Sequence, residues 1–241
     1  MGPHHLVRRL SIALIAALAL ASTQASAADC DRACLSGMLT RYIDALVAHD
    51  PSALPLTANA RFTEDSHELR LGEGLWQTVT RKGDFRHDYL DTSKHVAAAH
   101  VELFEGAVPV LYSVLLHMDG EQIAGIETLV QRVTPDSRFQ PTELGAPIRG
   151  MNDPVPPGEK QSRAALIATA LTYADGLRVG NFTDAGTAFA EQAYRVENGV
   201  ITAYEAFKIW GGQIRAINAF FATLPISTPR AWPSADPLPQ R

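Results

Sequence analysis

The segment RYIDALVAHDPSALPLTANARFTED, residues 41–65, combines a helix, a break and the start of a strand. Helical spacing starts just upstream, over residues 34–48, with one apolar stripe: Leu35, Met38, Leu39, Tyr42, Ile43, Leu46 and Val47. Pro51 ends this helix, because proline disfavours helical backbone in the residue before it. Residues 52–57 predict a short second helix, and ARFTED, residues 60–65, begins a strand. Tyr42 in the helix and Glu64 at the head of the strand together indicate a cavity that holds an acid and a base.

A run of strands is predicted downstream of this segment. LGEGLWQTVT, residues 71–80, is a glycine-punctuated loop, and Asp119-Gly120 is a hairpin signal. The predicted strands cover residues 84–91, 95–106, 108–120 and 121–133. Helices followed by strands are typical of the α+β class. We therefore predict a cone-shaped, curved antiparallel sheet with helices packed in its concave face, formed by residues 28–133.

The C-terminal half partly repeats this pattern. YADGLRVGN, residues 173–181, matches YIDALVAHD, residues 42–50, and AYRVEN, residues 193–198, matches ARFTED. Tyr173 and Glu197 then take the places of Tyr42 and Glu64. We predict that residues 161–228 are a partial repeat of the helix–strand unit that packs on the first domain, after a linker at residues 134–160. Residues 229–241 are predicted to be a proline-rich tail.

The first 27 residues have the pattern of a secretory signal peptide. Two arginines precede a twelve-residue apolar run, residues 10–21, and Ala25-Ser26-Ala27 fits a cleavage site. The apolar run is shorter than the roughly 20 residues that a membrane-spanning helix needs. We therefore expect export to the periplasm or beyond, with cleavage near Ala27 and no membrane association.

Charge and cysteine content restrict the partners. The formal net charge is −5, and the predicted leader holds two arginines and no acidic residue, so nucleic acid and anionic membranes are not expected as partners. Cys30 and Cys34 are the two cysteines; an exported chain can oxidise them, although a bridge within a continuous helix has poor geometry. With no further ligand near them, and no tight histidine spacing elsewhere, we expect no metal site.

Three segments carry a resemblance to a known family. RYIDALVAHD followed by ARFTED resembles the first helix and strand of the nuclear transport factor 2-like superfamily, which includes ketosteroid isomerase and the SnoaL-like polyketide cyclases. DGEQIAGIETLVQRV, residues 119–133, resembles its last hairpin, and FTEDSHELRLGEGLW, residues 62–76, is similar to a secreted subgroup with an FTEN-G…LGEGLW pattern. The resemblance covers residues 30–133 and, more loosely, 160–228. It implies a homodimer or homotrimer.

The resemblance also implies a site. In ketosteroid isomerase a tyrosine of the first helix helps to form the oxyanion hole, and a carboxylate at the end of the first strand moves the proton. Tyr42 and Glu64 match these positions. The family's second oxyanion donor, a protonated aspartate, has no match here, so its place is taken by Tyr112 or His117 or is empty. A dry cavity would raise the pKa of Glu64 and suit it to act as a base near neutral pH.

Alternatives remain open at this stage. A slip of one residue would turn Asp65 inward in place of Glu64. Tyr42 could equally be a core tyrosine, and Trp76 either walls a pocket for an aromatic ligand or covers the sheet edge. His100 is a further acid–base candidate, because His100 and Glu102 share one face of their strand. We count His100 as catalytic with Glu64 and Tyr42, and Trp76, Tyr112, His117 and Glu102 as substrate-binding.

Two functions of different classes follow from these expectations. The first is a cofactor-independent lyase or isomerase that acts on a small hydrophobic molecule, and no phosphate loop or dinucleotide fingerprint is found in the sequence. Some relatives of this type act on lignin-derived aromatic dimers and release formaldehyde, which makes a diaryl compound one expected substrate. The second is a non-catalytic exported module that binds a small molecule or a partner. The fold hosts both classes.

Overall fold

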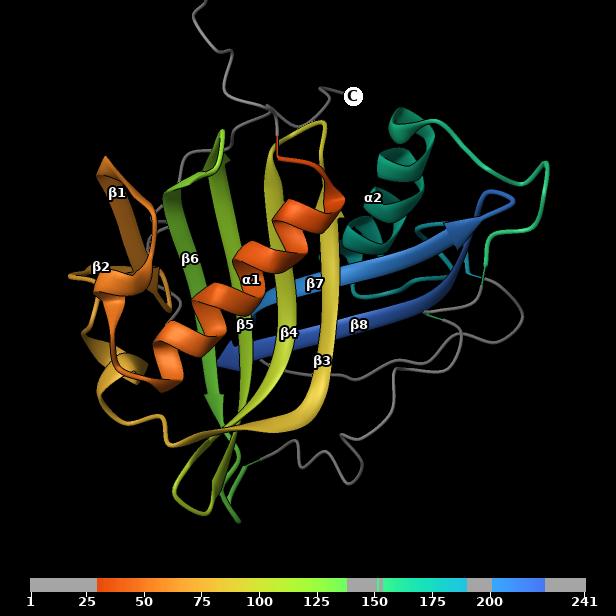
Figure 1. Cartoon of the computed structure of the whole chain (residues 1–241). Coiled ribbons are helices and arrows are strands. Elements are labelled where there is room, and N and C mark those ends of the chain that lie inside the picture. The colour runs from red at the N-terminus through yellow and green to blue at the C-terminus, as the bar shows by residue number, and fades with distance from the viewer. Residues whose placement is uncertain (1–29, 138–150, 152–153, 190–200, 224–241) are drawn as a thin grey trace, which may run out of the picture.

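A computed structural model describes residues 30–137, 151, 154–189 and 201–223 (Figure 1). The predicted signal peptide, most of the predicted linker and the tail lie outside these residues. In the described part of the chain, no helix is both long and apolar enough to cross a membrane.

Six strands of the described chain form one curved mixed sheet (Figure 1). They are β1 (Leu56–Glu64), β2 (His67–Leu69), β3 (Arg81–Asp91), β4 (Val96–Glu105), β5 (Val108–Asp119) and β6 (Gln122–Arg132), in the order β2-β1-β6-β5-β4-β3. The prediction of a curved sheet in an α+β fold is confirmed, but the prediction that it is wholly antiparallel is wrong, because β1 pairs with β6 in parallel. Strands β3 to β6 form a meander whose hairpins force antiparallel pairing. β1 joins its last strand from outside the meander, so no hairpin sets its direction.

Helix α1 (Arg32–Val47) packs on one face of this sheet. The Asp31 side chain caps the helix by accepting the Cys34 backbone N–H at 2.8 Å. The helix buries the predicted stripe against inward residues that alternate along the strands. Those of β4 and β5 are Ala97, Ala99, Val101, Leu103, Val110, Tyr112, Val114 and Leu116. The predicted second helix is shorter than expected: η1 (Pro51–Ala53) is a single 3₁₀ turn, and β1 begins at Leu56.

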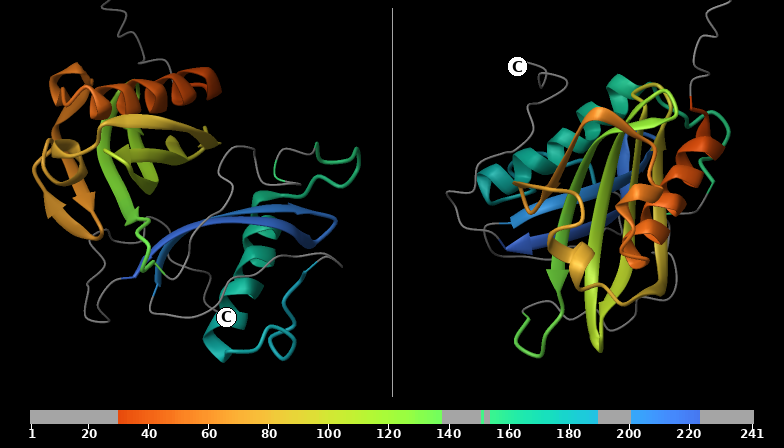
Figure 2. Two further views of the ribbon diagram at one scale, coloured as in Figure 1. Left: turned by 90° about the horizontal axis from the view of Figure 1, so that it is seen from below. Right: turned by 60° about the vertical axis from the view of Figure 1, so that its left-hand side comes forward.

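A second unit covers the opposite face of the sheet (Figure 2). Strands β7 (Ile201–Trp210) and β8 (Gln213–Thr223) form a hairpin, and α2 (Arg163–Val179) packs on its outer side through Tyr173, Ile209 and Ile214. Phe220 of β8 contacts Phe85 and Leu111 of the six-stranded sheet. A helix followed by paired strands agrees with the predicted order of elements. Glu197 lies outside the described residues, and the repeat stays a prediction.

A disulfide bond joins Cys30 to Cys34. Cys30 precedes the helix and its cap, so the bridge links the incoming chain to the first turn and does not lie within a continuous helix. The loop that it closes is short, and the chain-entropy model assigns such a loop only about 2 kcal/mol.

Removing this disulfide should therefore have a small effect. We expect the Cys30→Ser/Cys34→Ser variant to unfold with a free energy lower by no more than roughly 2 kcal/mol, because little denatured-state entropy is constrained. Urea denaturation of the oxidised protein, the reduced protein and this variant measures the difference. A loss of twice that size would show that the bridge fixes native geometry beyond its own loop.

Candidate functional site

Two tyrosine hydroxyls meet between α1 and the sheet. Tyr42 comes from the buried stripe of α1, and Tyr112 occupies an inward position of β5 between Val110 and Val114. Their hydroxyl oxygens are 2.8 Å apart, and the residues are 0% and 1% exposed. A hydroxyl pair closed in by apolar side chains keeps its hydrogen bond without competition from water.

Burial sets the protonation state of this pair. Burial raises the pKa of Tyr42 well above its usual value, and the nearby Tyr112 hydroxyl and Trp76 indole only partly offset that rise. Burial likewise raises the pKa of Tyr112, and the neighbouring Tyr42 adds to it. Both hydroxyls are therefore neutral at any physiological pH, and each is able to donate a hydrogen bond.

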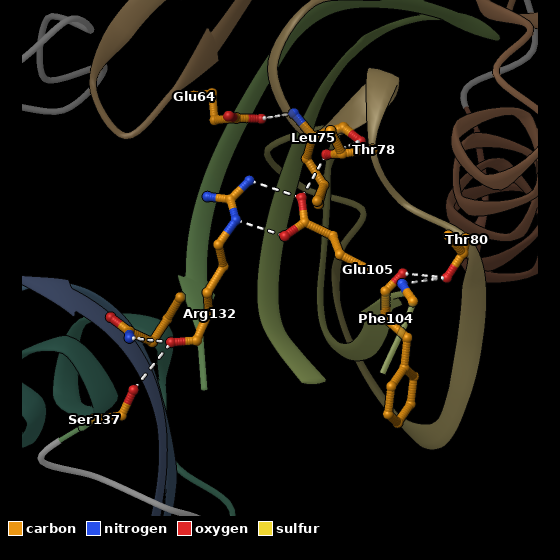
Figure 3. A network of polar contacts seen from close by, with 10 residues as sticks. Glu64, Leu75, Thr78, Thr80, Phe104, Glu105, Arg132 and Ser137 are labelled. Carbon is orange, nitrogen blue, oxygen red and sulfur yellow. Dashed lines mark hydrogen bonds and ion pairs between the residues drawn. The ribbon is translucent and has the colours of Figure 1, made fainter. Parts of the chain in front are cut away.

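Glu64 reaches this pair from the end of β1. Phe62, two residues earlier on the same face, is buried in the core beneath α1. The Glu64 carboxylate accepts the backbone N–H of Leu75 at 3.0 Å (Figure 3). Burial raises its pKa, although the Leu75 N–H opposes the rise. The carboxylate is also near enough to both tyrosines to raise their pKa further.

Asp65 has a different role from its neighbour. Its backbone is left-handed, with a φ of 51°, and its carboxylate accepts the backbone N–H of Val130 at 2.9 Å. Its own N–H donates to the Thr128 carbonyl at 3.0 Å. Burial raises the pKa of Asp65 as well. Asp65 thus ties the end of β1 to β6, and Glu64 is the carboxylate next to the tyrosines.

The glycine-rich loop covers the site. Within it, η2 (Gly74–Gln77) places Leu75 and Trp76 in the core at 0% and 1% exposure. The Trp76 ring meets the Tyr42 ring edge-on, with centroids 5.6 Å apart. Gly74 has a φ of +67°, and a Cβ there would lie 2.5 Å from a Glu64 carboxylate oxygen. The motif LGEGLW therefore needs a glycine at position 74, both for its backbone and for the close approach of Glu64.

An ion pair lies near the Glu64 side chain (Figure 3). Arg132, at the end of β6, donates to both carboxylate oxygens of Glu105 at 2.6 and 2.8 Å, and Thr78 donates to Glu105 as well. The Arg132 charge lowers the pKa of Glu64 and Asp65, though by less than burial raises them. The sequence did not point to Arg132, because its place beside Glu64 depends on the parallel pairing of β1 with β6.

The structure does not bring the other expected residues to this site. His100 and Glu102 do share a face of β4, as predicted, but it is the face turned away from α1. There His100 stacks on Phe220 with ring centroids 4.5 Å apart, and its Nδ1 lies 3.3 Å from the Tyr89 hydroxyl. His117 is on the same outer face and pairs with Glu127 at 2.6 Å. Tyr42, Glu64, Tyr112 and Trp76 are the expected residues that come together.

Among the described residues, no group of three or more His, Cys, Asp or Glu side chains is arranged to hold a metal ion.

Comparisons with known proteins concern the fold more than the site. A family model described as a domain of unknown function (DUF8021) matches residues 159–205, which include α2 and the start of β7. A comparison with curated proteins finds no significant match.

Several solved structures are similar to part of the chain. An NTF2-like protein of unknown function from Cytophaga hutchinsonii is 12% identical, covering 40% of this chain and 89% of its own, with a TM-score of 0.34. A putative ketosteroid isomerase from Kribbella flavida is 17% identical, covering 47% and 95%, with a TM-score of 0.34. A de novo designed protein with a curved β-sheet is 15% identical, covering 42% and 88%, with a TM-score of 0.36. These neighbours include an NTF2-like protein and a putative ketosteroid isomerase, the kinds of protein that the sequence resembles. Similarity at this level assigns this chain neither to a family nor to a function.

The hydroxyl pair should behave as a coupled unit in stability. Tyr42→Phe or Tyr112→Phe alone removes one hydrogen-bond partner of a buried hydroxyl, and we expect each to lower the free energy of unfolding by about 1–3 kcal/mol. The double variant removes both hydroxyls and should cost less than the sum of the two single changes. Urea denaturation of the four proteins measures the coupling. Additive losses would mean that the two hydroxyls do not depend on each other.

The half-buried Glu64 should make stability depend on pH. Because its pKa is higher in the folded state, the native protein holds more protons than the unfolded chain between the two values, and stability falls as pH rises through that window. The stability of wild type relative to Glu64→Gln should therefore decrease with rising pH. Hydrogen bonds from Arg70 lower the pKa of Glu73, so Glu73→Gln is a control of opposite sign. Thermal unfolding between acid and neutral pH tests both, and equal slopes for the two variants would contradict this assignment.

Proposed function

We propose that the protein is a cofactor-independent acid–base enzyme of the isomerase type that acts on a small, largely apolar carbonyl compound. The observation that carries the proposal is the buried Tyr42–Tyr112 hydroxyl pair near the partly desolvated Glu64 carboxylate. Perturbed pKa values of this kind, produced by burial beside a specific partner, are typical of catalytic groups. The sequence resemblance to ketosteroid isomerase assigns the same two roles to Tyr42 and Glu64.

The proposed reaction needs one proton transfer in each direction. Glu64 removes a proton from the carbon next to the carbonyl, and the electron pair of that C–H bond moves to the carbonyl oxygen. A tyrosine hydroxyl donates to this oxygen as its negative charge develops, while Glu64 becomes neutral. The protonated Glu64 then returns the proton to a different carbon, and the carbonyl forms again. The net charge of the site stays constant throughout, which suits an enclosure with few waters.

Burial supports both halves of this scheme. Desolvation raises the pKa of Glu64, and a carboxylate with a raised pKa is a stronger base near neutral pH. The hydroxyls keep their protons because burial raises their pKa too, and a preorganised donor in a dry site stabilises an oxyanion more than water does. A lyase that releases formaldehyde from a hydroxymethyl-bearing diaryl compound requires the same base, so that class belongs among the first compounds tested.

The alternative is a binding module that uses the same site without turnover. Proton exchange separates the two functions without knowledge of the product. Ketones of several shapes are incubated with the protein in heavy water, and NMR follows the loss of hydrogen from the carbon next to the carbonyl. Exchange that requires the protein supports an enzyme, and binding without exchange supports the module.

Glu64→Gln should reduce the rate of this exchange, or of turnover, by roughly 10²–10⁴-fold, the usual contribution of a well-placed base. Tyr42→Phe should fall between this variant and wild type, since one oxyanion donor is worth roughly 3 kcal/mol. The wild-type rate should fall as the pH drops through the raised pKa of Glu64, because only the carboxylate accepts a proton.

Glu205 of β7 provides the matched control. Burial raises its pKa as well, yet it lies on the hairpin beyond the opposite face of the sheet, so Glu205→Gln should leave the rate within a few-fold of wild type. Full activity of Glu64→Gln would show that Glu64 is not the base, and Asp65 would then be the next residue to test.

A further inference from the structure

A shallow groove of about 430 Å³ follows the solvent side of α1. The helix lines this groove with Gly37, Thr40, Arg41, Asp44, Ala45 and Ala48. All of these residues except Ala45 are exposed. Figure 2 shows α1 at the edge of the molecule, with the sheet beneath it and none of the described elements over its outer side. Another molecule can therefore reach this face of the helix.

The groove residues form a stripe that reads the same in both directions. Gly37, Arg41, Asp44 and Ala48 are separated by four, three and four positions, a spacing that places them along one face of the helix. A second α1, related to the first by a two-fold axis at the middle of the stripe, runs antiparallel to it. The axis sets Gly37 against Ala48 and Arg41 against Asp44, and each contact occurs twice, as a two-fold interface requires.

The sizes of the end residues fit this pairing. Gly37 and Ala48 have the smallest side chains, and the distance between two packed helices depends on the side chains at the contact. A Cβ placed on Gly37 would have no neighbouring atom within 4 Å in this chain, so nothing from the same chain fills the space over the glycine. Two helices can therefore approach closely at both ends of the stripe.

The charges at the centre of the stripe fit it as well. Arg41 donates through Nε to the Ala53 carbonyl at 2.6 Å, and Lys82 contacts Oδ1 of Asp44 at 2.6 Å. A guanidinium has five N–H donors and a carboxylate has two acceptor oxygens, so each group can take a second partner. Across the two-fold axis that partner has the opposite charge in both copies of the pair.

We propose that this groove binds the same groove of a second copy of the chain, which forms a two-fold dimer through antiparallel α1 helices and two Arg41–Asp44 ion pairs. The outer face of the six-stranded sheet is not open to a second copy, because the β7–β8 hairpin already covers it (Figure 2). The inference does not depend on the proposed function, since Tyr42 lies on the opposite, buried side of α1.

The length of the contact sets the strength of the dimer. The stripe from Gly37 to Ala48 is about 17 Å long at a rise of roughly 1.5 Å per residue. Such a contact is small among protein interfaces, and small interfaces belong to weak or transient complexes. The dimer therefore has a dissociation constant of roughly 10–100 µM.

Complementary charge reversal provides the test. Arg41→Asp alone sets two carboxylates against each other in both pairs, and Asp44→Arg alone sets two guanidinium groups against each other. Sedimentation of the purified proteins over a range of concentrations should show that each variant associates with itself at least roughly ten-fold more weakly than wild type. An equimolar mixture of the two variants should form a heterodimer, because every pair across the axis then joins opposite charges. The mixture also controls for folding, since it contains the same two proteins.

A second pair of variants tests the close approach of the helices. Gly37→Leu adds a side chain where this chain leaves open space, so the fold should persist while self-association weakens by roughly ten-fold. Ala164→Leu adds similar bulk at an exposed position of α2, on the far side of the sheet, and should leave self-association unchanged.

Several results would overturn the proposal. A wild-type protein that stays monomeric well above the expected dissociation constant would show that a second copy does not occupy the groove. Single charge reversals that associate as wild type does, or a mixture of them that stays monomeric, would show that any dimer forms through another surface. Equal association of Gly37→Leu and Ala164→Leu would exclude the close pairing of the two helices.

Discussion

The parallel pairing of β1 with β6 is the constraint on which the site depends. Its register sets Phe62 beside Ile126 and Glu64 beside Thr128, which turns Glu64 toward the face that α1 covers. Three hydrogen bonds lock that register: Asp65 gives its N–H to Thr128 and accepts one from Val130, and the Thr128 hydroxyl donates to the Thr63 carbonyl at 2.9 Å. A shift by one residue would exchange the faces of Glu64 and Asp65. By fixing this register, Asp65 therefore keeps Glu64 on the face of the sheet that α1 covers.

The same region concentrates groups that do not favour stability. A partly desolvated carboxylate and two buried hydroxyls lie together, although an apolar core of equal volume would be more stable. On the outer face Tyr89 accepts from Asn218 of β8 and His117 is paired with Glu127, whereas the buried Ser113 hydroxyl has no hydrogen-bond partner among the described residues. Polar burial alone therefore does not tell the two faces apart, and the candidate site is recognised by the Glu64 carboxylate near the hydroxyl pair.

Local sequence patterns decide which parts of the fold and of the candidate site could be predicted. The stripe of α1, which contains Tyr42, and the meander from β3 to β6 follow from periodicity and turn signals, whereas Glu64 was matched by the family resemblance and Asp65 stayed open as an alternative. The placement of His100 failed because His100 is itself buried, against Phe220 of the hairpin, on the face of β4 that is turned away from α1. Burial on both faces removes the polar–apolar alternation that would tell inside from outside. Arg132 was missed because a parallel pairing between distant strands leaves no local signal.

Under the proposed function, one carboxylate would both hold the loop and move the proton. In its charged form Glu64 holds the Leu75 N–H, and a hydrogen bond to a charged acceptor is about twice as strong as a neutral one. Under the proposed reaction, Glu64 would become neutral when it accepts a proton from the substrate, and its bond to the Leu75 N–H would weaken. Once the proton had left Glu64, the charged carboxylate would regain this bond, so the hold on the loop would follow the protonation state of the base.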